Sequence, residues 1–350
     1  MFRRTQQTNR GAARRTRSLN GTRKLDSSPS SQPDPLLGAL ATADGLAIGG
    51  APPEGIPMAL HGIPPENNVV EASPCSISPE AALADDLEPG TREFYGRALR
   101  VLTDAGVPFL VGGAYALTHY AGILRRTKDL DIFVRRQHCE DALDVLAAEG
   151  FETVLAFPHW LGKAFSKGHD LLDVIFSSGN GLAEVDDAWF EHAGRSEIFG
   201  VEVLICPPEE MIWAKAFIME RERFDGADVA HVLRCYGEKL DWGRLLARFG
   251  QHWRVLLSQL ILFGFIYPTE KDRIPSWVLH DLISRLSADA EAPPPSEKIC
   301  RGTLLSRAQY LVDIERAGYE DARLQPSGGS MTPEEIAHWT AAIDRAKSAV

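Results

Sequence analysis

The chain has 350 residues, of which 44% are hydrophobic and 24% are charged, a composition typical of a globular protein rather than of a disordered or fibrous one. Its formal net charge of −11 argues against general nucleic-acid binding, which comes mainly from basic residues that neutralise phosphates. The longest apolar run, Val255 to Tyr267, is too short to cross a bilayer, and the cysteines show neither zinc-type spacing nor a disulfide framework, so we expect a cytoplasmic protein without a membrane span.

Residues 1–88 are rich in Pro, Ser, Gly and Arg and show neither the period of a strand nor that of a helix. Basic residues gather in the first 24 positions, where no acid occurs. This composition predicts a disordered, solvated tail. A basic arm that contacts nucleic acid remains an alternative interpretation.

Residues 89–206 alternate between helical and strand patterns, which predicts a compact domain with both kinds of element. A Gly-Gly turn follows the first strand, and a helix begins directly after it. The expected helices are about 91–106, Ala114–Leu124 and Glu140–Ala148, and the expected strands are Val107–Val111, Leu130–Val134, Phe151–Phe157, Leu171–Phe176 and Ile198–Ile205.

The pattern becomes helical after Pro207-Pro208, which predicts a helical domain over 207–290 and a linker with C-terminal helices over 291–350. Glu209 and Glu210 in the first turn suit the dipole of a helix expected to reach about Arg223. Tryptophans at apolar positions, among them Trp242 and Trp277, are expected to pack between helices. Further helices are expected at Asp225–Cys235, Trp242–Phe249, Trp253–Phe265, Trp277–Leu286, Leu304–Ala317 and Pro333–Ser348, the last with a capping box at Thr332 and Glu335.

Two aspartates one residue apart carry the main chemical signal. Asp129 and Asp131 share one face of their predicted strand, whereas the apolar Leu130 and Ile132 share the other. Carboxylates held so close repel each other unless a cation lies between them. The glycine turn upstream could let phosphate oxygens approach backbone N–H groups, so the sequence predicts a metal-assisted phosphate site.

Asp173 lies within another apolar strand pattern, where an isolated carboxylate would be costly to bury. If this strand lies beside the first, Asp173 completes a three-carboxylate cluster suited to Mg²⁺, and two such ions can assist a nucleotidyl displacement. Asp129 and Asp131 would then bind the ions and, through them, a nucleoside triphosphate (NTP). Asp173 would hold the ion that activates the attacking hydroxyl, or act as its base. The alternative is that these aspartates only face solvent.

At these residues the chain resembles the nucleotidyltransferase superfamily, whose fold is shared with enzymes similar to DNA polymerase beta. The resemblance rests on Val111-Gly112-Gly113, on Asp129-Leu-Asp131 and on Asp173, and it covers about residues 94–206. A weaker likeness to abortive-infection toxins extends to about Val232. The resemblance to nucleotidyltransferases implies an α+β fold, in which a mixed sheet is flanked by helices. The helical domain follows it in this chain.

The resemblance also implies roles for the site residues. Gly112 and Gly113 would contact the triphosphate, and Lys215, on an apolar helix, would contact a phosphate as the helical lysine of the toxins does. Lys128, with Arg125 and Arg126, either steadies the triphosphate or forms a solvated basic edge. The implied reaction transfers a nucleoside monophosphate from NTP to a hydroxyl of a small molecule, a protein or a tRNA 3′ end.

Other charged residues are expected to have structural roles. Arg221 and Arg223 are expected to form surface ion pairs with Glu220 and Glu222, and Asp225 with Asp228 to cap a helix. His159 and His169 flank the third strand and are expected to be solvated. Two other functions remain open: a nucleotide-binding regulatory module without turnover, and the toxin of a two-component pair with a cognate partner protein.

Overall fold

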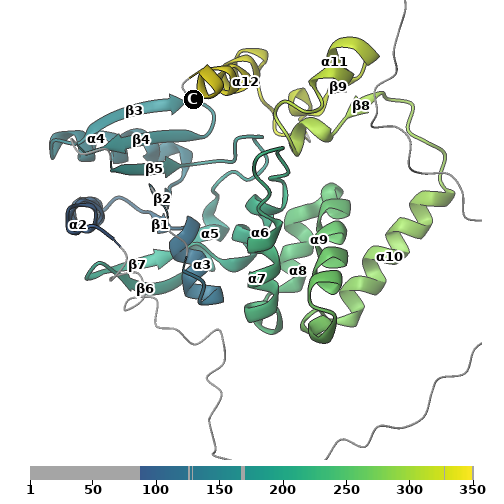
Figure 1. The fold of residues 1–350 in the computed structure, drawn as a ribbon, viewed down its shortest axis with the longest axis horizontal. Coiled ribbons are helices and arrows are strands. Elements are labelled where there is room, and N and C mark those ends of the chain that lie inside the picture. Colours follow the sequence, from purple (N-terminus) through teal and green to yellow (C-terminus); the bar gives the residue numbers. More distant parts are fainter. Residues whose placement is uncertain (1–86, 125–126, 128, 167–169, 327, 349–350) are drawn as a thin grey trace, which may run out of the picture. The chain divides into compact units, whose positions relative to one another are not determined.

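The computed structural model describes residues 87–124, 127, 129–166, 170–326 and 328–348 (Figure 1). The predicted tail over 1–88 lies almost wholly outside the described residues. Arg125, Arg126, Lys128 and His169 also lie outside them, so their expected roles stay predictions.

The fold is built around a seven-stranded mixed sheet with strand order β3-β4-β5-β2-β1-β7-β6 (Figure 1). Strand β2 runs parallel to β5, and β1 runs parallel to β7, while the remaining neighbours are antiparallel. The predicted mixed sheet is therefore confirmed. The strands are β1 (Leu110–Val111), β2 (Asp129–Phe133), β3 (Glu152–Phe157), β4 (Leu161–Phe165), β5 (Leu171–Ile175), β6 (Gly194–Ile198) and β7 (Val201–Ile205).

Two features of the sheet differ from the sequence prediction. The single strand expected at 198–205 is the hairpin β6–β7, which turns at Phe199 and Gly200, both with positive φ. Such a turn matches the twist of antiparallel strands, and the Phe199 ring stacks on Tyr95 at 5.9 Å between centroids. Strand β4 was not expected, because Gly162 and Lys163 interrupt its apolar pattern.

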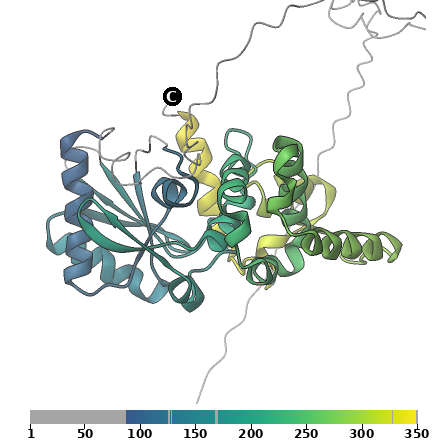
Figure 2. The same ribbon diagram turned by 90° about the horizontal axis from the view of Figure 1, so that it is seen from below.

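Helices cover both sides of the sheet (Figure 2). Helices α2 (Pro89–Asp104) and α4 (Cys139–Ala148) pack against each other, and α4 also contacts β3, β4 and β5. Helix α3 (Gly113–Ala121) contacts β2 and, in the helical region, α7. It ends three residues earlier than expected, at Gly122 with φ +63°. The short helix α5 (Asp187–Glu191) is capped by the Asp186 side chain.

The helical region begins with α6 (Pro208–Ala216), which is shorter than the helix expected to reach Arg223. The chain turns back after Ala216, and a bridge between Met219 and Phe224 closes a small hairpin over residues 218–225. The helices that follow are α7 (Gly226–Tyr236), α8 (Trp242–Phe249), α9 (Trp253–Ile266) and α10 (Ser276–Glu291). Trp242 is buried as expected, whereas Trp277 is 52% exposed on α10, against the prediction.

The first turn of α6 is held by a buried ion-pair network. Glu209 and Glu210 are 3% and 0% exposed, and both accept hydrogen bonds from Arg244 of α8. Arg248 donates to Glu210 at 3.0 Å and also to the α5 cap residue Asp186. Removing one partner from such a network leaves a charge buried and unpaired, so the network ties α6 to α8 and, through Asp186, to α5.

The C-terminal region returns to the sheet. Helix α12 (Pro333–Ser348) contacts β3, and the capping box between Thr332 and Glu335 is confirmed by reciprocal hydrogen bonds of 2.8 and 3.2 Å. The helix expected at 304–317 is an α-helix only over α11 (Leu311–Ala317), and a short parallel pair, β8 (Ile299–Cys300) with β9 (Glu320–Asp321), flanks it.

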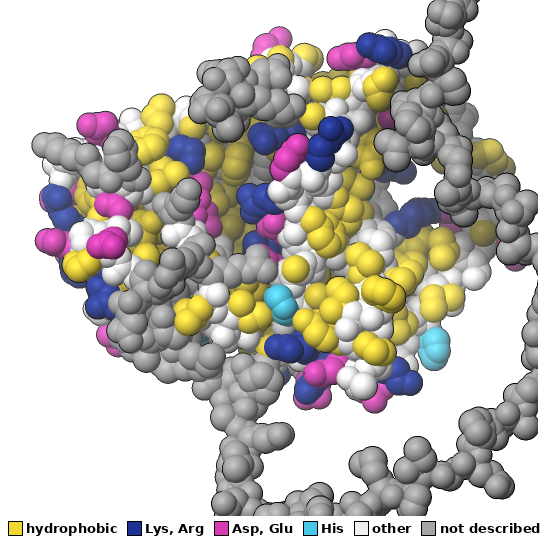
Figure 3. All heavy atoms as spheres, viewed as in Figure 1, with side chains coloured by type: hydrophobic (Ala, Val, Ile, Leu, Met, Phe, Trp, Pro, Cys, Tyr) yellow, Lys and Arg dark blue, Asp and Glu magenta, His cyan; other side chains and the backbone are white. Residues whose placement is uncertain are grey.

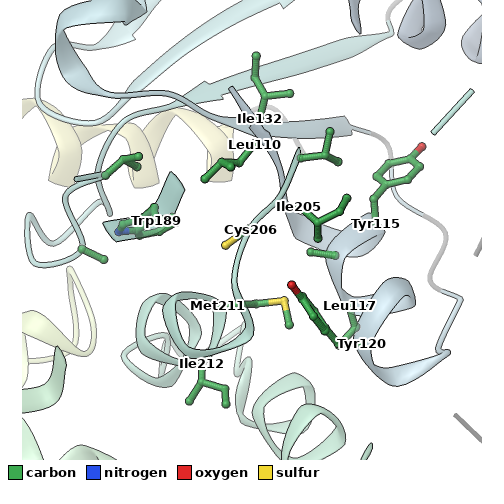
Figure 4. Close-up of a cluster of buried hydrophobic side chains, with 14 of the residues drawn as sticks. Leu110, Tyr115, Leu117, Tyr120, Ile132, Trp189, Ile205, Cys206, Met211 and Ile212 are labelled. Carbon is green, nitrogen blue, oxygen red and sulfur yellow. The ribbon is translucent and has the colours of Figure 1, made fainter. Parts of the chain in front are cut away.

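One hydrophobic core joins the sheet to the helical region (Figure 4). Leu110, Ile132 and Ile205 from the sheet belong to the same buried cluster as Tyr115 of α3 and Ile212 of α6, and all five are almost fully buried. Each such aliphatic side chain contributes roughly 1.5–3 kcal/mol when it leaves water. The domain boundaries expected near 206 and 290 stay predictions. Among the described residues, no helix is both long and apolar enough to span a membrane.

Candidate active site

The sheet register brings the predicted carboxylates together. Asp131 of β2 and Asp173 of β5 are direct register partners on adjacent parallel strands. Leu130 and Ile132 are fully buried on the opposite face of β2, which leaves Asp129 and Asp131 on the face that carries Asp173. Carboxylate oxygens of the three aspartates all lie within 4.8 Å of one another.

The two glycines close this cluster on the side of β1. The Gly112 N–H donates to the Asp131 backbone carbonyl at 2.9 Å, and Gly113 has φ +52°. A Cβ at Gly113 would lie 1.8 Å from Asp131 Oδ2, and one at Gly112 would lie 2.1 Å from the Phe133 ring. Both positions therefore exclude a side chain, and the turn fits directly against the carboxylate.

Helix α3 starts at this turn with its first backbone N–H groups near the carboxylates. Its first turn contains no acidic residue, and no side chain caps it. Gly113 and Ala114 line the same cleft as the three aspartates. The N-terminus of a helix favours negative charge, so it suits the oxygens of a phosphate.

Burial and mutual repulsion make the cluster electrostatically unusual. Burial, then the charges of Asp129 and Asp173, raise the pKa of Asp131 to about 7. Burial also raises the pKa of Asp173, although the Lys163 ammonium opposes this rise. Burial and mutual repulsion therefore disfavour the charged forms of these carboxyls, and perturbed pKa values of this kind are typical of functional sites.

Lys163 is a residue that the sequence did not indicate as part of the site. It is the register partner of Asp173 on β4, and its Nζ lies 2.6 Å from Asp173 Oδ1. A lysine inside a sheet strand gives no local signal of such a contact, because the pairing of β4 with β5 must be known first.

A Lys163→Met variant is expected to lose on the order of 1–3 kcal/mol of unfolding free energy, because it leaves a buried carboxylate without its partner. Lys163 favours the charged form of Asp173, so its loss raises the pKa of that carboxyl further. The destabilisation should therefore be larger at about pH 8 than at about pH 5, where Asp173 can take up a proton. Urea unfolding at both pH values measures this difference, with Lys163→Arg as the charge-conserving control. An equal loss at both pH values would contradict the assigned contact.

Lys215 and Arg223 supply positive charge from the helical region. Lys215 Nζ lies 3.0 Å from Asp225 and 2.8 Å from Asp228, and Arg223 forms two hydrogen bonds to Asp225. The expected phosphate contact of Lys215 stays a prediction, although Lys215 lines the cleft. The hydrogen bond to Asp225 raises the pKa of Arg223 most, and the charges of Asp131 and Asp129 raise it further.

The structure corrects three of the structural roles expected from the sequence. Arg223 pairs with Asp225 rather than with Glu220 or Glu222, because the hairpin over 218–225 turns it toward the cleft. Asp225 precedes α7, but its side chain binds Lys215 and Arg223 instead of capping the helix. His159 is 6% exposed and contacts the Gly179 carbonyl at 3.2 Å, so it is not solvated.

The aspartates line a cleft of about 500 Å³ between the sheet and α6. Figure 3 shows this hollow, with acidic and basic side chains gathered along it. Three segments distant in sequence complete its walls. They are the loop after β5 (Ser177–Asn180), the hairpin residues Ile218, Glu220 and Arg223, and C-terminal residues including Leu304–Arg307 and Trp339.

Residues 93–261 match the model of a family described as an uncharacterised nucleotidyltransferase. This segment contains the Gly-Gly turn, the three aspartates and Lys215. The predicted resemblance to nucleotidyltransferases is therefore confirmed. The chain matches none of the curated proteins.

Solved structures of nucleotidyltransferases are distantly similar. The lincosamide antibiotic adenylyltransferase LnuA, bound to lincomycin, is 12% identical, with a TM-score of 0.31 over 42% of this chain and 98% of its own. An antigenic nucleotidyltransferase-like protein from Paracoccidioides brasiliensis is 18% identical, with a TM-score of 0.30 over 48% and 91%. The Thermotoga maritima CCA-adding enzyme, complexed with tRNA, is 12% identical, with a TM-score of 0.24 over 75% and 80%. Likenesses this distant carry no argument about the acceptor.

Proposed function

We propose that the protein is a Mg²⁺-dependent nucleotidyltransferase, which moves a nucleoside monophosphate from NTP to an acceptor hydroxyl and releases pyrophosphate. The observation that carries the proposal is the convergence of Asp129, Asp131 and Asp173 beside the bare N-terminus of α3. The carboxylates suit a divalent cation, and the helix N-terminus suits a phosphate. The family match of residues 93–261 supports the same reaction class.

The residues present fit Mg²⁺. Three carboxylates offer hard oxygen ligands within 4.8 Å of one another. Burial, followed by repulsion from Asp129 and Asp173, raises the pKa of Asp131, and a divalent cation would relieve that repulsion. Asp129 and Asp131 would hold the cation from one strand and Asp173 from the next. When bound, Mg²⁺ would neutralise charge on the triphosphate and on the departing pyrophosphate.

The protein's own residues would bind the triphosphate on one side of β2 and act on the attacking hydroxyl on the other. The backbone N–H groups of Gly113 and Ala114 would bind triphosphate oxygens, and Arg223 and Lys215 would contact them from the opposite wall. On the other side of β2, Asp173 would accept the proton of the attacking hydroxyl as its oxygen bonds to the α-phosphorus and the bond to pyrophosphate breaks.

The proposal is tested with NTPs that carry a label on the α-phosphate. Each NTP is incubated with the full chain, Mg²⁺ and a cell extract, and both pyrophosphate release and labelled products are measured. Pyrophosphate release together with a labelled product is the expected result. Binding of NTP without pyrophosphate release would indicate a nucleotide-binding module instead.

Mg²⁺ is expected to stabilise the protein more strongly as pH rises. Between about pH 4 and 7 the folded, metal-free protein holds a proton on Asp131 that the unfolded chain has lost, so its stability falls as pH rises. Mg²⁺ competes with that proton. Saturating Mg²⁺ should therefore raise the melting temperature by about 5 °C at about pH 8 and by much less at about pH 5.5. Thermal melts with KCl at matched ionic strength are the control, and an equal shift at both pH values would argue against this site.

A further inference from the structure

We propose that the C-terminal residues Leu304–Arg307 and Trp339 form the acceptor subsite of the cleft, and that the acceptor is a compact hydroxyl-bearing ring molecule. This inference rests on the proposed function. The family match ends at residue 261, so these residues lie outside the segment that carries the carboxylates. They nevertheless line the same cleft.

The sheet order places Leu304–Arg307 and Trp339, which form one wall of the cleft, on the acceptor side. Strand β2 lies between β1, which leads into the glycine turn, and β5, which carries Asp173. The triphosphate would therefore lie toward β1 and the attacking hydroxyl toward β5. The loop Ser177–Asn180 follows β5 directly, and it is this loop that the C-terminal residues contact.

The wall is held in place by specific contacts on two sides. Asn180 Nδ2 donates to the Leu304 carbonyl at 2.7 Å, and both residues are buried. On the other side, the Glu220 carboxylate accepts hydrogen bonds from the Ser306 hydroxyl and from the Arg307 backbone N–H. The Met219 N–H donates to the Leu305 carbonyl at 3.1 Å. The segment is thus fixed between the β5 loop and the hairpin that carries Arg223.

Trp339 supplies an aromatic surface to this subsite. A Cβ at Gly179 would lie 2.4 Å from Trp339 Cζ2, so the ring lies directly against the backbone of the β5 loop. The His159 ring lies 6.0 Å away between centroids, and the Arg307 guanidinium lies 5.9 Å from the centre of the Trp339 ring. Trp160 lines the same cleft. Tryptophan offers a large, rigid contact face for a flat or ring-shaped ligand.

The charge and size of the cleft favour a small acceptor over a nucleic-acid end. The acidic side chains among its described lining residues are those of Asp129, Asp131, Asp173, Glu210, Glu220, Asp225 and Asp228, and the basic ones are those of Lys215, Arg223 and Arg307. Nucleic acids bind mainly where basic groups neutralise their phosphates, so this lining disfavours an RNA acceptor. The whole cleft of about 500 Å³ lies within the usual range of small-ligand pockets, and because the NTP would occupy part of it, the remaining space suits a small acceptor.

A Trp339→Ala variant of the full chain tests the subsite. Protein and α-labelled ATP, GTP, CTP or UTP are incubated with Mg²⁺ and a cell extract, which is then separated into small molecules, RNA and protein. We expect wild type to label the small-molecule fraction and Trp339→Ala to lose about tenfold of that label, with Trp339→Phe retaining most of it. Binding of a fluorescent (mant) ATP with Mg²⁺ should change by less than about twofold in both variants.

Trp277→Ala is the matched control, because Trp277 is an exposed tryptophan on α10 outside the cleft. It should behave as wild type, and melting temperatures confirm that each variant is folded. Label in RNA or protein, or full activity of Trp339→Ala, would overturn the inference but leave the proposed function intact. Absence of label from every fraction with wild type would contradict the proposed function itself, and the inference with it.

Discussion

An Asp131→Asn variant is expected to lose nucleotidyl transfer by about a thousandfold or more and at the same time to become more stable without metal. Asp131 is the register partner of Asp173 and shares a strand face with Asp129, so its loss removes both a cation ligand and one of three charges that repel one another. A bound cation contributes several kcal/mol to transition-state stabilisation, which corresponds to this loss of rate. Removing the repulsion should raise the unfolding free energy of the metal-free protein at about pH 8 by about 1–2 kcal/mol.

Two measurements on the same sample test whether activity is lost while stability is gained. Pyrophosphate release gives the activity, and urea unfolding in the presence of a metal chelator gives the stability. Asp144→Asn is the control, because Asp144 is an exposed carboxylate on α4 outside the cleft. A variant of Asp131 that loses both stability and activity would indicate a structural carboxylate rather than a site that holds a cation.

A Gly113→Ala variant is expected to abolish Mg²⁺ binding and to reduce activity by about a hundredfold or more. The new Cβ would overlap Asp131 Oδ2 at 1.8 Å, so the carboxylate must leave its position against the turn. Alanine at a positive φ also costs roughly 1–2 kcal/mol of stability. Titration with Mg²⁺ by calorimetry and pyrophosphate release measure the two effects.

Gly106→Ala separates the clash from the backbone strain. Gly106 also has a positive φ, +70°, but a Cβ there would meet no atom within 4 Å. This control should therefore lose a similar amount of stability while keeping its Mg²⁺ response and activity. If the two variants behave alike, the fit between Gly113 and Asp131 has no functional role.

Local pattern was enough to predict the strand that carries Asp129 and Asp131, because acidic and apolar residues alternate over Asp129–Ile132. The glycine turn and Asp173 could also be recognised from the sequence as candidate functional residues, because they lie within or beside apolar strands. That Asp173 lies opposite Asp131 follows from the pairing of β2 with β5, which no local pattern specifies. The three carboxylates could therefore be identified from the sequence. Whether they lie close together depended on the strand pairing, which the sequence alone did not give.

The site residues that were not predicted from the sequence are positioned by contacts between distant segments. Lys163 interrupts an apolar strand, and its partner Asp173 becomes evident only from the register of β4. Arg223 lies among other charged residues, and only the hairpin after α6 directs it to the cleft. Residues 304–307 were expected to begin a helix, but α11 starts only at Leu311, and these residues are instead held by the side chains of Asn180 and Glu220, which are far away in sequence.

The most direct test of the three-carboxylate site is anomalous diffraction from crystals soaked with Mn²⁺ and a non-hydrolysable NTP. We predict an anomalous peak about 2.1 Å from carboxylate oxygens of Asp129 and Asp131, with Asp173 on its other side and the triphosphate toward Gly113. Nucleotide bound in the cleft without a metal peak between these aspartates, or a metal bound elsewhere, would contradict the account.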